Sequence, residues 1–189
     1  MSNVVLDVSI SIDGFVAQTN DDPGRLNDWI FKGTDGDGAS DVNRQVLDDA
    51  RSPDALGAVV MGRRIFEVGQ EPWGPEPPFH CPVFVVTHRA HETLTKADTT
   101  FTFVTDGLES ALRQAKSVAG DSIVMIMGAN TARQYLELGS IDVIQLHVIP
   151  IVFGEGVRLI DHLGSHVELE QTRLIDCPGV THIYYRVVK

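Results

Sequence analysis

The segment Gly57-Ala58-Val59-Val60-Met61-Gly62-Arg63-Arg64-Ile65-Phe66-Glu67 carries the pattern that decides the fold. Residues 57–61 form a short, continuous apolar run, which predicts a buried strand. Gly62 and two arginines follow at once, and a short helical turn is predicted over residues 64–68, ended by Gly69. A buried strand that passes directly into a helix is the repeating unit of α/β proteins.

The same alternation of apolar runs and helical patterns extends in both directions along the chain. Further strands are predicted at 4–10, 83–87, 101–105, 122–127 and 142–148. Helices are predicted from a cap at Ser40 or Asp41 through Val42, Val46, Leu47 and Ala50, from a cap at Asp106 to Gly120, and over 129–138. Prolines exclude regular structure from residues 70–82. The runs 167–175 and 180–188 predict an antiparallel hairpin.

These elements predict a single domain over residues 1–189. Strands that alternate with helices need crossover connections and therefore pair in parallel, whereas the C-terminal hairpin adds antiparallel strands. We expect an α/β fold with about eight strands in one mixed sheet and helices on both faces.

Composition excludes several classes of protein. The net charge is −11, with 26 acidic and 15 basic residues, so phosphate backbones and anionic membranes are repelled. No apolar run approaches the ~20 residues that span a bilayer. The N-terminus has no basic stretch before Asp7, so we expect no signal peptide and a cytoplasmic protein. Cys81 and Cys177 lie far apart and are expected to be ordinary thiols, and no metal site is expected.

Three segments place small or basic residues directly after predicted strands. They are Gly62-Arg63-Arg64, Thr87-His88-Arg89 and Gly128-Ala129-Asn130-Thr131. Open α/β sheets bind ligands at the carboxyl ends of their strands, and helix N-termini favour anions. A nucleotide with a pyrophosphate and one further phosphate would account for all three segments. Taken singly, each is also explained by tight packing or by solvated arginines. The Gly-x-Gly-x-x-Gly and P-loop patterns are absent.

Five segments, in this order, resemble a known family. They are Ser9-Ile10-Ser11-Ile12-Asp13-Gly14-Phe15-Val16-Ala17, Met61-Gly62-Arg63-Arg64-Ile65-Phe66-Glu67, Thr87-His88-Arg89, Met127-Gly128-Ala129-Asn130 and Leu146-His147-Val148-Ile149-Pro150-Ile151-Val152-Phe153-Gly154-Glu155-Gly156. Together they are similar to the dihydrofolate-reductase superfamily, in the branch of the reductase domain of bifunctional riboflavin deaminase-reductases. Gly128-Ala129-Asn130 departs from the usual Gly-Gly pair of that family.

The resemblance implies a dihydrofolate-reductase-like fold and an NADPH cofactor. It implies that cofactor contacts come from Ser9, Val16, Gly62, Arg63, Arg64, Thr87, His88, Arg89, Gly128, Ala129, Asn130 and Thr131. Among these, residues 62–64 would hold phosphates, residues 87–89 the 2′-phosphate, and residues 128–131 the pyrophosphate beside the nicotinamide. Residues 13–17 would close over the reactive ring.

The resemblance also implies candidate residues for catalysis and substrate binding. Asp13 is the candidate catalytic residue, which orients a water or the loop; a role in making the turn is the alternative. In dihydrofolate-type members an acid on the helix before the Met-Gly-Arg strand holds the pterin, and Asp48 and Asp49 are the candidates here. Glu155 either contacts substrate or is a solvated loop acid.

The expected function is hydride transfer from NADPH to a C=N or C=O bond of a small heterocyclic substrate, pterin-like or pyrimidine-like. One alternative is the 5-amino-6-(5-phosphoribosylamino)uracil reductase step of riboflavin biosynthesis. Its phosphate needs a second basic pocket, for which Lys32, Arg44 and Arg158 are scattered candidates. Another alternative is a nucleotide-binding module without turnover. A homodimer is expected if the apolar residues of 143–148 meet a second copy, although core packing explains them equally well.

Overall fold

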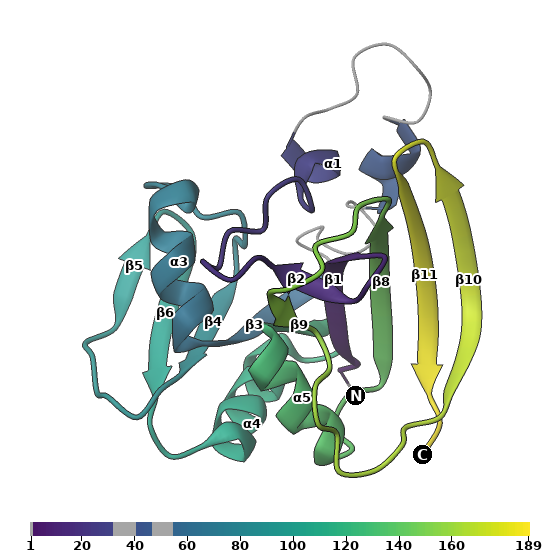
Figure 1. Cartoon of the computed structure of the whole chain (residues 1–189). Coiled ribbons are helices and arrows are strands. Elements are labelled where there is room, and N and C mark those ends of the chain that lie inside the picture. Colours follow the sequence, from purple (N-terminus) through teal and green to yellow (C-terminus); the bar gives the residue numbers. More distant parts are fainter. Residues whose placement is uncertain (1, 32–40, 47–54) are drawn as a thin grey trace.

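A computed structural model describes residues 2–31, 41–46 and 55–189 of the chain (Figure 1). Within these ranges nine strands form one sheet in the order β10-β11-β8-β1-β7-β3-β4-β6-β5. They are β1 Val4–Ser11, β3 Leu56–Gly62, β4 Pro82–Val86, β5 Leu94–Lys96, β6 Thr99–Val104, β7 Ile123–Met127, β8 Val143–Ile149, β10 Leu169–Cys177 and β11 Val180–Val187. A second, two-stranded sheet pairs β2 (Phe15–Ala17) with β9 (Val157–Arg158).

The centre of the main sheet is parallel and its edges are antiparallel. β8, β1, β7, β3, β4 and β6 run in one direction, so their carboxyl ends meet at one edge. β5 is antiparallel to β6 at one side, and the hairpin β10–β11 is antiparallel to β8 at the other. The sheet is therefore mixed, with the predicted hairpin at the C-terminus.

Helices cover both faces of this sheet. They are α1 Asp28–Phe31, α3 Arg63–Trp73, α4 Leu108–Ala119 and α5 Ala129–Glu137, and residues 41–46 are also helical. Val60 packs in one core cluster with residues of α4 and α5, whereas its neighbour Val59 packs in another with Phe66 of α3. A third cluster joins Leu26, Trp29 and Val46 to β8 and the β10–β11 hairpin. Alternate residues of the central strands thus feed separate cores, because successive side chains point to opposite faces.

The predicted mixed sheet of about eight strands is confirmed; the main sheet has nine, and the additional strand is β5, which is too short and polar to predict. Several predicted boundaries are wrong. Asp106 is not a cap: α4 begins after Gly107, and no side chain caps it. In the helix at 41–46, Val42 is exposed while Asn43 and Val46 are buried. Leu47 and Ala50 lie outside the described residues.

The helix α3 is much longer than the predicted turn and runs through Gly69 and Pro72 to Trp73. Pro72 lies in the last turn, where its ring costs the helix a single backbone hydrogen bond. A Cβ on Gly69 would lie only 2.2 Å from Cζ2 of Trp73. Gly69 is therefore a packing position for an aromatic ring, and it does not stop the helix.

Cys81 and Cys177 are both free and buried. Burial raises the pKa of the Cys81 thiol to about 12, so this cysteine is a packing residue without thiolate character. None of the helices in the described ranges has the length and apolarity that a membrane-spanning segment requires.

Candidate functional site

The three turns singled out in the sequence leave the same edge of the sheet. β7, β3 and β4 are adjacent and parallel, with Met61 opposite Met127 and Gly62 opposite Val86. The turns that follow these strands therefore lie side by side. This is the edge at which open α/β sheets bind their ligands.

Gly62 and Gly128 let two of these turns approach each other closely. A Cβ on Gly62 would lie 2.7 Å from Oγ1 of Thr131, and a Cβ on Gly128 would lie 2.9 Å from Cγ1 of Ile65. Gly128 also has a φ of +97°, which residues with side chains rarely adopt. The two glycines let the starts of α3 and α5 pack closely, with Thr131 against Gly62 and Ile65 against Gly128; this zone of close approach is called the strip below.

Both helices that start at this strip have uncapped N-termini. Neither Gly62 before α3 nor Gly128 before α5 supplies a side-chain hydrogen bond to the first turn. The first N–H groups of a helix have no partner inside the helix, and they carry a partial positive charge. Two such ends side by side suit the phosphates of a dinucleotide.

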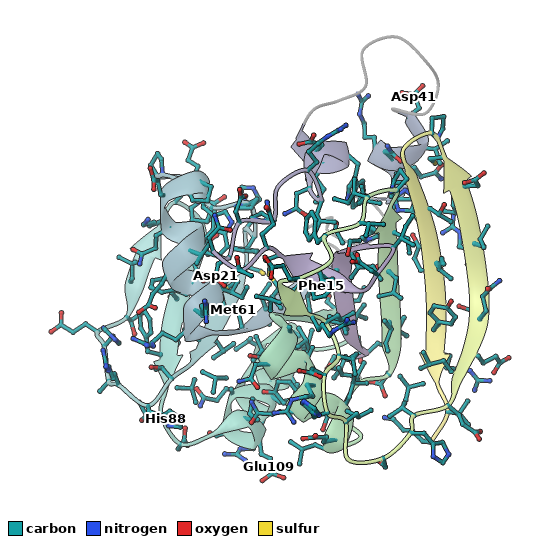
Figure 2. The ribbon with its side chains drawn as sticks, in the orientation of Figure 1. Phe15, Asp21, Asp41, Met61, His88 and Glu109 are labelled. Atoms are coloured by element: carbon teal, nitrogen blue, oxygen red, sulfur yellow. The ribbon has the colours of Figure 1, made fainter. Side chains whose placement is uncertain are left out.

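The basic side chains of the site differ in how they are paired. Arg63 donates to Glu67 at 2.8 Å, and Arg64 donates through Nε to Asp21 at 2.7 Å. Figure 2 shows Asp21 over α3. Arg89, in contrast, is exposed and has no carboxylate partner among the residues that the structure describes. Arg89 is therefore the basic residue of the site that is available to an added phosphate without displacing an acid.

The turn after β4 has a compact local structure. Thr87 is buried; its N–H donates to the carbonyl of Val104, and its Oγ1 accepts from the N–H of Arg89 at 3.1 Å. His88 is exposed and is labelled in Figure 2 on the side of the molecule remote from α1. Thr87 thus shapes the turn, and His88 and Arg89 are the side chains it presents to solvent.

The turn after β7 presents a mixture of groups. Ala129 is half-buried, Asn130 is exposed and Thr131 is buried against Gly62. Oδ1 of Asn130 accepts from Arg133 at 3.3 Å, within the same helix. Backbone N–H groups are therefore the main donors that this turn offers.

The carboxylate of Asp13 joins two loops by hydrogen bonds. Its carboxylate accepts from Oγ of Ser11 at 2.6 Å, from the N–H of Phe153 at 3.2 Å and from the N–H of Gly154 at 2.7 Å. The Ser11 hydroxyl, followed by these backbone donors, lowers the pKa of Asp13 to about 2. Asp13 is ionised at neutral pH, and its contacts join the turn after β1 to the loop at 153–154. Its role as the candidate catalytic residue, which orients a water or the loop, stays a prediction beside the turn-making role.

The other predicted residues are distributed as follows. Ser9 lies on β1 and its Oγ accepts from Nε1 of Trp29 at 2.9 Å, so its hydroxyl is covered by α1. Val16 is half-buried on β2 and packs against the core. Glu155 is exposed in the loop before β9. Asp48, Asp49 and Lys32 lie outside the described residues.

The two described arginines proposed for a substrate phosphate are held by different segments. Arg44 lies 3.9 Å from Asp41 on the same helix. Arg158 donates to the carbonyl of Asp13 at 3.3 Å and lies over the ring of Phe15. Both are engaged locally, and the described residues do not gather them into a second basic pocket.

Sequence reasoning missed a group of buried polar residues beneath α1. Asp7, His147, His182 and Asn43 are all buried, and they approach one another in that order. The available signal was an acid and two histidines inside otherwise apolar strands. Their meeting could not be foreseen, because they come from three strands and one helix far apart in the chain.

The sequence matches the RibD C-terminal domain family over residues 2–183. The chain belongs to this family. The protein YyaP of Bacillus subtilis (strain 168), which is uncharacterized, is 24% identical over 191 residues, or 96% of this chain and 93% of that protein.

Solved structures share the fold of this RibD C-terminal domain. A protein of Shewanella sp. PV-4 assigned to riboflavin biosynthesis superimposes with a TM-score of 0.72 and 20% identity over 100% of both chains. The deaminase-reductase of Thermotoga maritima matches 99% of this chain and 57% of its own, with a TM-score of 0.67 and 15% identity. Dihydrofolate reductase of Enterococcus faecalis, complexed with NADP(H), matches 99% and 97%, with a TM-score of 0.63 and 14% identity.

The predicted family and fold are thereby confirmed. The chain is a reductase-family domain with a dihydrofolate-reductase-like fold.

Proposed function

We propose that this protein is an NADPH-dependent reductase that transfers a hydride to a C=N or C=O bond of a small heterocyclic substrate. The observation that carries the proposal is the strip between the turns after β3 and β7, where two glycines and two uncapped helix ends meet. NADPH would supply the hydride when bound. Family membership supports the reductase class.

The residues at the sheet edge fit a dinucleotide phosphate. A Cβ on Gly62 would clash with Thr131 and a Cβ on Gly128 with Ile65, so the glycines keep the two helix starts close together. The first N–H groups of α3 and α5 have no side-chain cap and are available to an anion. The turn after β4 is next along the edge and carries Arg89, which suits a phosphate beyond the pyrophosphate. Residues 87–89 are therefore the proposed 2′-phosphate contacts.

The substrate is proposed only as a heterocycle. The riboflavin-pathway substrate carries a phosphoribosyl group, which calls for cations in addition to those that hold the cofactor. Arg44 and Arg158 are engaged by Asp41 and by the Asp13 turn. This arrangement favours the broader substrate class over that single step.

Calorimetric titration with NADPH and with NADH tests the cofactor. Tight binding of NADPH is expected, followed by its oxidation at 340 nm with a dihydropterin or an aminopyrimidinone acceptor. Binding without oxidation of either acceptor would favour the non-catalytic nucleotide module. Failure to bind either nucleotide would refute the proposal.

The double substitution His88→Ala/Arg89→Ala tests the 2′-phosphate contacts. Charge-assisted hydrogen bonds contribute roughly 1.5–3 kcal/mol each, so two of them favour NADPH over NADH by roughly 10²–10⁴-fold. The double variant should lose most of that preference while its affinity for NADH stays nearly constant. Arg186→Ala, on the β10–β11 hairpin, is the control and should leave both affinities unchanged. Equal losses for the two nucleotides would place the 2′-phosphate elsewhere.

A further inference from the structure

Four buried polar side chains form a continuous chain under α1. Oδ1 of Asp7 lies 3.4 Å from Nε2 of His147, a nitrogen that makes no hydrogen bond to any described residue, and Nδ1 of His147 lies 2.7 Å from Nδ1 of His182. Nε2 of His182 lies 3.0 Å from Oδ1 of Asn43. Both imidazoles are essentially inaccessible to water, with 1% and 0% of their surface exposed. A buried polar group that lacks a hydrogen-bond partner costs free energy, so the positions of the protons in this group matter for its stability.

This chain joins the sheet to the segment that covers it. Asp7, His147 and His182 come from β1, β8 and β11, whereas Asn43 belongs to the helix at 41–46. Trp29 of α1 lies on both imidazoles, with ring centroids 4.5 Å from His147 and 4.9 Å from His182. Residues 26–31 and 41–46 are called the cover segment below. Figure 1 shows α1 beside the upper ends of β8 and β11.

The short His147–His182 contact limits how many protons the chain can hold. Two nitrogens 2.7 Å apart accommodate one hydrogen between them, because two N–H groups cannot point at each other at that distance. At most one of the two rings is therefore an imidazolium while the contact persists. While the His147–His182 contact persists, the four buried side chains offer no position for a second added proton.

Hydrogen-bond directions then define two allowed arrangements. With the Asn43 carbonyl oxygen facing His182, that ring donates from Nε2, and the proton between the rings belongs to His147. Nε2 of His147 then carries no proton and lies 3.4 Å from Asp7 without a hydrogen bond; one extra proton, on His147 or on the carboxyl group, would allow a hydrogen bond to form. In the second arrangement this proton is lost, Asp7 is ionised, and the Asn43 amide turns so that its NH₂ group donates to His182. The orientation of the Asn43 amide thus depends on whether the Asp7–His147–His182 group holds the extra proton.

Among the residues that the structure describes, the following other charges lie on the elements around the four buried side chains. On the sheet side, Asp7 attracts a proton to the pair, whereas Arg173 of β10 disfavours one on His182. On the cover side, Arg25 is paired with Asp28 at 3.4 Å, and Arg44 lies 3.9 Å from Asp41. Burial, followed by the neighbouring His147, lowers the pKa of His182 to about 4. Protonation of both rings is thus opposed by burial and by mutual repulsion.

We propose that Asp7, His147, His182 and Asn43 form a one-proton lock that holds the cover segment on the sheet. Uptake of a second proton breaks the His147–His182 contact and releases Trp29 and Asn43. The lock is next to the candidate cofactor site: continuing the register of β1 with β7 puts Val8 opposite Gly128, and Ser9 is opposite His147. Two strand spacings, about 10 Å, therefore separate β8 from the Gly128 turn. The proposal does not depend on the reductase function.

The proton count is tested on the wild-type chain labelled with ¹⁵N-histidine. The protein has seven histidines, and the spectra of His147→Gln and His182→Gln assign the two signals. Between pH 8 and pH 5 we expect His182 to stay neutral, and its ring protonation to begin only near pH 4. Two imidazolium rings together with an intact native spectrum at pH 5 would overturn the proposal.

Release of the cover segment is tested through Trp29. In the Trp73→Phe background Trp29 is the remaining tryptophan, so its emission reports the lock. Acid should change this emission and increase amide exchange in residues 26–31 more than tenfold, at a pH where α5 is still protected. Asn43→Ala should shift this release to higher pH, whereas His80→Gln, at an exposed imidazole, should not. Simultaneous loss of protection in α5 and in residues 26–31 would show that no separate lock exists.

Discussion

At the scale of single residues, Gly128 is the position where the candidate site depends most on the absence of a side chain. Its φ is +97°, and a Cβ there would lie 2.9 Å from Ile65. At Gly62 an added Cβ would clash with the side chain of Thr131 alone. The candidate site therefore depends on the absence of side chains at these two glycines as much as on its charged residues.

Gly128→Ala should destabilise the protein by about 1–3 kcal/mol and weaken nucleotide binding at least tenfold, because it combines backbone strain with a steric clash. Gly139→Ala is the matched control. Gly139 also has a positive φ, +62°, but a Cβ there meets nothing within 4 Å. The control should lose stability from backbone strain but retain nucleotide affinity. Urea unfolding and calorimetric titration measure the two effects; equal affinity losses would contradict the role of the strip.

At the scale of elements, α3 depends on the contact between Gly69 and Trp73. The Trp73 ring also packs edge-on against Phe79 and stacks on Phe101, so it has little freedom to move. This contact anchors the end of the helix whose beginning carries Gly62, Arg63 and Arg64. The packing of one ring thus helps to position the candidate phosphate site.

Gly69→Ala tests this anchor because the two competing effects have opposite signs. Alanine in an ordinary helix interior is about 1 kcal/mol more favourable than glycine. Here the new Cβ would lie 2.2 Å from the Trp73 ring, so we expect a net loss of about 1–3 kcal/mol in urea unfolding. In a Trp73→Leu background the same substitution should become neutral or stabilising. A stabilising effect in the wild-type background would disprove the anchor.

At the scale of the whole molecule, the buried histidines make stability depend on pH. The pKa of His182 is about 4 in the folded chain and 6.5 at its ordinary value, so the unfolded state binds a proton that the folded state excludes. This contribution to stability is complete above about pH 6.5 and is lost as the pH falls toward 4. At 1.36 kcal/mol for each pKa unit, the loss is about 3 kcal/mol.

The free energy of unfolding should therefore fall between pH 6.5 and pH 4, as measured by urea titration at each pH. In His182→Gln this part of the slope should be absent, although the variant is less stable at neutral pH because it breaks the buried chain. His91→Gln, at an exposed imidazole, should keep the wild-type slope. An unchanged slope in His182→Gln would assign the pH dependence to other groups.

Local patterns were sufficient to predict eight of the nine strands of the main sheet, its parallel centre and the C-terminal hairpin. Residues 57–61 read as a buried strand because a central parallel strand is apolar on both faces. The turns at Gly62, Thr87 and Gly128 could be placed on one edge of the sheet because the carboxyl ends of parallel strands lie at the same edge. Gly69 and Pro72 misled the prediction of α3, because a ring that fills the space above a glycine leaves no local signal.

The amino-acid sequence by itself determined the α/β class, the family and the edge of the sheet that carries the candidate site. Only the tertiary structure decided which arginines are already paired, that Asp13 clasps a loop, and that Asp7, Asn43, His147 and His182 meet. The physical reason is the separation along the sequence. Strand and helix signals come from residues a few positions apart, whereas the tertiary contacts named here join residues up to 145 positions apart, as Asp13 and Arg158 are.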